Sequence, residues 1–111
     1  MATCIFCRLI ADPNFVALYR DDDVVAFADL NPQAPVHFLV VPRRHVETLS
    51  ELDDDHLLGR IFAAVHKVAR EQGVAEGGYR MVFNQGPNAG QTVYHVHLHV
   101  LGGRQLTWPP G

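Results

Sequence analysis

The chain has 111 residues, of which 48% are apolar and 19% charged, and its formal net charge is −3 with the histidines neutral. This size and balance predict one globular domain with one core, and the lack of a basic excess argues against nucleic acid as a partner. The chain starts without a signal peptide and has no apolar run near the ~20 residues that cross a bilayer, so we expect a cytoplasmic protein without membrane contact.

The first third of the chain reads as a short helix followed by strands. A helical turn is expected over 6–11. Two strands follow within 14–35, separated by the acidic turn Asp21–Asp23. An apolar run rich in β-branched residues predicts a third strand over 36–42, which ends at a proline.

One long helix is predicted over 52–73. Its apolar residues recur at steps of three and four, which gives a single stripe: Leu58, Ile61, Phe62, Val65, Val68 and Ala69. Asp53 is the expected N-cap, and Gly73 suits the C-terminal end.

The last third predicts two more strands, over 78–86 and 92–103, around a loop at 84–92 that contains Gly, Asn and Pro. Four or five strands with short connections and one long helix indicate an α+β fold with an antiparallel sheet. Since a chain of this length buries limited apolar surface, a subunit partner is also plausible.

Three histidines alternate in "YHVHLHVLGG" at 94–103. In a strand, His95, His97 and His99 would share one face. A rise of ~3.3 Å per residue separates the outer two Cα atoms by roughly 13 Å, whereas a zinc–nitrogen bond is about 2.0–2.1 Å long. We therefore favour separate roles for the three rings over one shared zinc ion. A solvated or hydrogen-bonded polar face is the alternative.

The neighbouring loop is suited to binding an anion. Gly86 and Gly90 can adopt positive φ and expose backbone N–H groups. Three neutral polar side chains could hydrogen-bond phosphate oxygens: Asn84, Gln91 and Thr92. A neutral imidazole is available as a nucleophile at pH 7, and a phosphorus centre held by this loop would be its electrophile. An ordinary hairpin loop is the alternative.

Cys4 and Cys7 form one C-x-x-C motif. In a reducing cytosol a structural disulfide is improbable, which leaves metal binding, redox chemistry or chance.

The segment "HVHLHV" at 95–100 resembles the signature of the histidine-triad (HIT) family. Three further stretches resemble its Hint branch: 29–45, 78–105 and the terminal "WPPG" at 108–111. The resemblance implies a single HIT domain over 1–111, with an antiparallel sheet of about five strands, one long helix and a short N-terminal helix. It also implies a homodimer whose sheets join into one.

The resemblance further implies a purine nucleoside phosphoramidase that releases an AMP or GMP unit from an amine without a catalytic cofactor. His97 would be the nucleophile, forming a nucleotidyl-histidine that water hydrolyses. His99 and His37 would lie near the phosphate. The group that protonates the leaving amine is left open.

The resemblance also implies a nucleotide pocket. Asp29 would bind the ribose, and the loop residues Asn84, Gly90, Gln91 and Thr92 would contact phosphate. The purine would lie between apolar walls: Phe6, Leu9, Phe27 and Leu30. These could instead be ordinary core residues. Ala28 replaces a histidine found in some relatives, and Trp108 would reach the partner's active site.

By the same resemblance, Cys4, Cys7, His45 and His95 would form a structural zinc site, because a Cys2His2 set leaves no open coordination position. Unpaired, reduced thiols are the alternative. Two other functions compete with the phosphoramidase: a metallohydrolase that uses the triad as ligands, and a nucleotide-binding or scaffolding protein with little catalysis.

Overall fold

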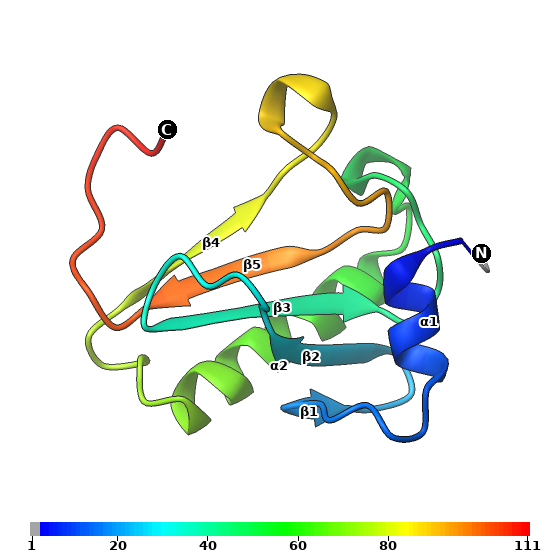
Figure 1. The fold of residues 1–111 in the computed structure, drawn as a ribbon, viewed down its shortest axis with the longest axis horizontal. Helices are drawn as coiled ribbons and strands as arrows, with labels where there is room; N and C mark the ends of the chain where they lie inside the picture. The colour runs from blue at the N-terminus through cyan, green and yellow to red at the C-terminus, as the bar shows by residue number, and fades with distance from the viewer. Residues whose placement is uncertain (1–2) are drawn as a thin grey trace.

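The computed structural model describes residues 3–111. Five antiparallel strands form one sheet in the order β1-β2-β3-β5-β4 (Figure 1). Along the chain, the elements are α1 (Ile5–Ala11), β1 (Tyr19–Arg20), β2 (Val24–Ala28), β3 (Val36–Pro42), a 3₁₀ turn η1 (Leu49–Glu51), α2 (Asp55–Glu71), β4 (Tyr79–Phe83), a second turn η2 (Pro87–Ala89) and β5 (Leu98–Gly102). The expected α+β class, five-stranded sheet, long helix and short N-terminal helix are confirmed.

The two helices pack on opposite faces of the sheet (Figure 1). α2 buries the main core, which includes Val24 and Ala26 of β2. The alternate residues Val25 and Phe27 face the other way and pack with Phe6 of α1. Because both faces are covered at this end, β2 and β3 are almost continuously buried and read as apolar runs without alternation.

α2 is shorter than the predicted helix. Its N-cap is Asp54, not Asp53, because the side chain of Asp54 accepts the N–H of Leu57 at 3.0 Å. The helix ends at Glu71, and Gly73 follows with a φ of 77°. Phe62, expected in the buried stripe, is 37% exposed and packs edge-on against Phe83 of β4.

β5 also starts later than predicted, at Leu98 instead of residue 92. The N–H of Val96 is donated to the carbonyl of Val46 at 2.8 Å, so this segment is held to the chain that follows β3 before it joins the sheet. Tyr94, which a strand from residue 92 would place on the face opposite the histidines, is 39% exposed. The alternating residues predicted too long a strand, because the contact with Val46 leaves no trace in the sequence around Val96.

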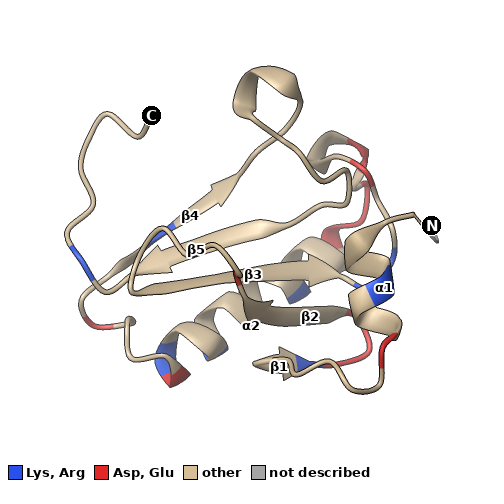
Figure 2. Ribbon diagram, viewed as in Figure 1, with Lys and Arg blue, Asp and Glu red and all other residues tan. Residues whose placement is uncertain are grey.

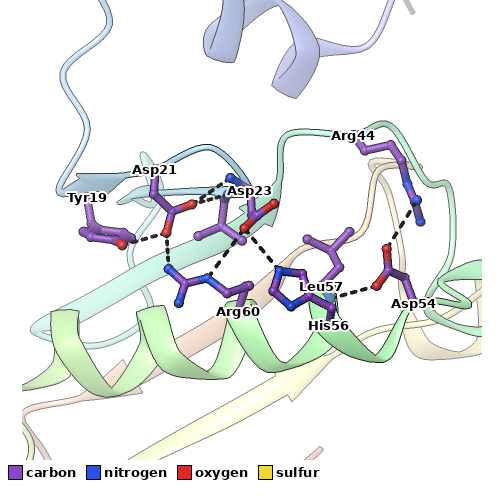
Figure 3. A network of polar contacts seen from close by, with 9 residues as sticks. Tyr19, Asp21, Asp23, Arg44, Asp54, His56, Leu57 and Arg60 are labelled. Atoms are coloured by element: carbon purple, nitrogen blue, oxygen red, sulfur yellow. Dashed lines mark hydrogen bonds and ion pairs between the residues drawn. The ribbon is translucent and has the colours of Figure 1, made fainter.

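An ionic network ties α2 to the turn between β1 and β2 (Figure 3). Asp21 Oδ2 accepts from the Tyr19 hydroxyl at 2.6 Å and from Arg60 at 2.7 Å. Burial works to raise the pKa of Asp21, but these bonds and those from the backbone outweigh it and hold the pKa well below its usual value. Asp23 lies 3.6 Å from Arg60 and 3.7 Å from His56.

Charged residues surround the sheet but are absent from the ribbons of β3 and β5, which have no Lys, Arg, Asp or Glu (Figure 2). Among residues 3–111, no helix combines the length and the apolar character needed to cross a membrane. The uncharged strands β3 and β5 carry His37 and His99, and His97 directly precedes β5.

Candidate active site

A cavity of about 420 Å³ opens between α1, the end of β2 and the loop before β5. It brings together ten residues singled out from the sequence: Phe6, Leu9, Phe27, Asp29, Leu30, Asn84, Gly90, Thr92, His97 and His99. Three other predicted residues are not among those that line it: His37, Gln91 and Trp108. The predicted pocket therefore forms largely from the expected side chains.

One end of the cavity is apolar. Phe6 and Phe27 meet edge to face with their ring centroids 5.6 Å apart, and Phe15 packs on Phe27 at 5.3 Å. Phe27 belongs both to the core and to the cavity wall, whereas Leu30 is 99% exposed at the rim and is no core residue. Sequence reasoning missed Phe15, which lies in a segment without regular structure. This end suits a flat aromatic ligand.

The polar end contains His97, whose tautomer is set by the backbone. Nδ1 of His97 lies 2.7 Å from the carbonyl oxygen of His95, and a carbonyl can only accept. The ring proton of neutral His97 is therefore on Nδ1, and Nε2 has a free lone pair. The ring is 9% exposed, lines the cavity and packs edge-on against Phe6 at 5.1 Å. The ring is thus held in one orientation with the lone pair on Nε2.

A second backbone group fixes His99 through His37. The N–H of Gln33 is donated to Nδ1 of His37 at 3.0 Å, so His37 carries its proton on Nε2. This proton is donated to Nδ1 of His99 at 2.9 Å, which leaves the proton of His99 on Nε2. His97 therefore offers an acceptor, and His99 offers a donor.

Because Nδ1 of His99 accepts from His37, this arrangement requires a neutral His99 ring, and its pKa meets the requirement. Burial lowers the pKa of His99 to about 4, and the neighbouring His97 and His37 act in the same direction, while Asp29 opposes them. His37 is 8% exposed and lies behind His99. The expected group of histidines therefore forms, with His37 acting through His99.

The loop before β5 has the backbone conformation expected for it. Gly86 and Gly90 both have a φ of 80°. Gln91 is buried, and its amide accepts from Gly86 N at 2.9 Å and donates to the carbonyls of Glu47 and Val93 at 2.8 and 3.2 Å. Its polar atoms therefore brace the loop, which presents Asn84 and Thr92 to the cavity.

The four predicted zinc ligands form a separate cluster. Their ligand atoms all lie within 4.8 Å of one another. Nδ1 of His95 is 3.4 Å from Cys4 Sγ and 3.6 Å from Cys7 Sγ, and Nδ1 of His45 is 3.4 Å from Cys7 Sγ. Tetrahedral zinc with ordinary bond lengths requires sulfur–nitrogen separations of about 3.6 Å. The donor set therefore fits zinc.

The orientation of His95 supports the same reading. Its Nε2 lies 2.8 Å from the carbonyl oxygen of Pro42, so the proton is on Nε2 and Nδ1 faces the two sulfurs with a free lone pair. Burial lowers the pKa of His95, which favours the neutral form that binds metals. The first histidine of the triad therefore belongs to the cysteine cluster, separate from the cavity.

Trp108 lies in the C-terminal tail. It is 80% exposed, and the guanidinium of Arg80 lies 6.0 Å from its ring centroid. The expected contact with a partner's active site stays a prediction.

Comparison with known proteins identifies the family that this arrangement defines. The model of the HIT domain matches residues 13–106, and the chain therefore belongs to the HIT family.

Two relatives and one solved structure make the assignment more specific. A HIT-like protein of Synechococcus elongatus is 51% identical, over 85% of this chain and 83% of the relative. The adenylylsulfatase HINT1 of Arabidopsis thaliana is 46% identical, over 96% of this chain and 76% of the relative. The crystal structure of a HIT family hydrolase from Legionella pneumophila is 46% identical, with a TM-score of 0.88, over 97% of this chain and 99% of that chain.

Proposed function

We propose that the protein is a purine nucleoside phosphoramidase, which hydrolyses the P–N bond, or an acyl-phosphate bond, at the α-phosphate of an AMP or GMP conjugate. One observation carries the proposal: the lone pair of His97 Nε2 lies in a cavity with an apolar end and neutral phosphate-binding groups. The solved HIT family hydrolase and the adenylylsulfatase relative support hydrolysis of nucleotide conjugates.

In this mechanism Nε2 of His97 attacks the α-phosphorus, the P–N bond breaks, and the leaving amine takes up a proton from the solvent. Water then attacks the nucleotidyl-histidine and returns a proton to the solvent, AMP is released, and Nε2 of His97 recovers its lone pair. The N–H on Nε2 of His99 donates to the phosphate, while Asn84 and Thr92 hold its oxygens. Asp29 accepts hydrogen bonds from the ribose hydroxyls, and the base lies against Phe6 and the other apolar walls.

Cys4, Cys7, His45 and His95 would hold a structural zinc ion. When bound, this ion would supply cross-linking of α1 to the segments after β3 and before β5, and no catalysis. The carbonyl of His95, which orients His97, lies on one of these cross-linked segments. A bound zinc ion would therefore stabilise the backbone segment that orients His97.

We also propose a homodimer. β4 ends the sheet, and among residues 3–111 its outer edge pairs with no strand. The exposed apolar side chains of Phe62 on α2 and Met81 on β4 lie beside that edge. Joining two β4 edges would satisfy the backbone groups and cover these side chains. Trp108, in the tail beside β4, would then reach the partner's cavity.

The alternative of a metallohydrolase using the triad as ligands has weaker support. The ring nitrogens of the three histidines face different partners: the two sulfurs for His95, a carbonyl for His97 and His37 for His99. His97 belongs to neither of the potential metal-binding clusters within residues 3–111. A binding protein without catalysis is the other alternative, and turnover tests it directly.

Intact-mass spectrometry during turnover of adenosine 5′-phosphoramidate is the decisive experiment. We expect an added adenylyl group on His97, which is absent in His97→Ala together with turnover. The matched control is His56→Ala, which changes an exposed histidine on α2 and should keep wild-type turnover. Full activity of His97→Ala would refute the nucleophile, and tight AMP binding without turnover of phosphoramidates would favour the binding protein.

A further inference from the structure

The single proton of neutral His37 has two acceptors within reach. The N–H of Gln33 occupies Nδ1 of His37, so the proton is on Nε2. This nitrogen lies 2.9 Å from Nδ1 of His99 and 3.4 Å from Oδ2 of Asp29. The imidazole and the carboxylate therefore compete for one N–H group.

Asp29 also reaches His99 directly. Its Oδ2 lies 3.9 Å from Nδ1 of His99, while its Oδ1 accepts the N–H of Asn31 at 2.8 Å. A free carboxylate thus supports a second arrangement, in which the two rings move apart from their 2.9 Å contact, His37 donates to Asp29, and the proton of His99 moves to Nδ1, facing the same carboxylate. Nε2 of His99 would then face the cavity as an acceptor. Because His37 is buried, the choice between these hydrogen bonds matters energetically.

We propose that occupancy of Asp29 by the ribose hydroxyls selects the tautomer of His99, which makes Asp29 a positioning residue as well as a sugar-binding residue. The proposal rests on the proposed function, which brings a ribose to this carboxylate. Hydroxyl donors take up the lone pairs of Oδ2, so the proton of His37 is committed to Nδ1 of His99. The proton of His99 is then held on Nε2, the nitrogen that faces the phosphate.

Sugar recognition is thereby coupled to the chemical step. A substrate without ribose hydroxyls leaves Asp29 free to draw the proton of His99 onto Nδ1, and the donor to the phosphate is lost. A residue that only binds the sugar would instead affect the affinity for substrate and leave the chemical step unchanged.

Kinetics with adenosine 5′-phosphoramidate and its 2′,3′-dideoxy analogue separates these two roles. In the wild-type protein we expect kcat for the dideoxy substrate to fall by about tenfold or more, since a positioned proton donor typically contributes about 10²–10⁴-fold. In Asp29→Asn, kcat for the two substrates should agree within about twofold. Asp53→Asn, which changes an exposed carboxylate before α2, should keep the wild-type ratio. A higher KM with unchanged kcat for the dideoxy substrate would overturn the proposal.

Nitrogen-15 NMR of the histidine rings tests the same point without turnover. With AMP bound, Nε2 of His99 should show the shift of a fully protonated nitrogen in the wild-type protein, and 2′,3′-dideoxy-AMP should give a mixture of tautomers. Identical His99 shifts with the two nucleotides at saturation would refute the coupling, even if phosphoramidates are turned over. If no phosphoramidate is turned over, the proposed function fails, and the NMR comparison still decides the role of Asp29.

Discussion

Replacing Gln91 with alanine separates two roles for this residue. The family resemblance implies that the Gln91 side chain contacts phosphate, whereas the structure directs its amide to three backbone groups of the loop before β5 and the segment after β3. If the amide braces the loop, Gln91→Ala should first reduce stability. If it binds phosphate, the variant should first lose nucleotide affinity.

The structure gives the size of the effect. Three hydrogen bonds are lost, each contributing about 0.5–1.5 kcal/mol net, and water can reach part of the exposed groups. The free energy of unfolding should therefore fall by about 2–4 kcal/mol. For a domain of this size, such a loss lowers Tm by about 10–20 °C.

Urea denaturation and calorimetric titration with AMP measure the two quantities separately. The matched control is Gln85→Ala, an exposed glutamine of the same loop whose amide bonds, among residues 3–111, only to Ser50. Because water can replace both bonds at this exposed position, the variant should cost less than about 1 kcal/mol. A stability loss for Gln91→Ala no larger than that of the control, together with a large loss of AMP affinity, would refute the bracing role.

Three further predictions follow from the described geometry. First, burial depresses the pKa of His99 to about 4, so the unfolded chain binds more protons between pH 6.5 and 4. The free energy of unfolding should fall as pH drops through that window, and His99→Gln should remove about 1–3 kcal/mol of the fall, after allowance for partial exposure. If urea denaturation gives the same pH dependence of this free energy for the wild type and His99→Gln, the burial of a neutral ring is refuted. Second, elemental analysis should find one zinc ion per wild-type chain and a clear loss in Cys7→Ser; metal-free wild-type protein with an unchanged Tm would argue for ordinary thiols. Third, sedimentation should give a dimer for the wild-type chain and a monomer for Met81→Glu, while Val16→Glu, at a position that is 87% exposed before β1, should stay dimeric. Dissociation of both variants, or of neither, would contradict the β4 interface.

The sequence predicts the fold well wherever local pattern and tertiary structure agree. The apolar stripe of α2 reflects burial of one face, and the uninterrupted apolar runs of β2 and β3 reflect burial of both faces. The periodicity of apolar residues indicates such burial directly. The start of β5 was misplaced because the N–H of Val96 is donated to Val46, fifty residues earlier. Alternation of residue types carries no information about such a partner.

Some features of the candidate site could likewise be predicted from the sequence, and others could not. The types and spacing of His97, His99 and Asn84 indicated phosphate chemistry, and these residues meet at one cavity. The bracing role of Gln91 depends on Glu47, which is remote in sequence, and the contact between Asp29 and His37 depends on the conformation of the turn between β2 and β3. A sequence shows which groups are present, and only the folded chain shows which of them already have partners.

The tautomers of the three ring systems depend on main-chain atoms: the carbonyls of Pro42 and His95 and the amide of Gln33. Every residue type has a carbonyl, and every type except proline has an amide hydrogen, so replacements at Pro42 and Gln33 can leave the protonation pattern intact. Insertions are different. One extra residue between β2 and β3 would displace the amide of Gln33 and release Nδ1 of His37 without altering any side chain of the pocket.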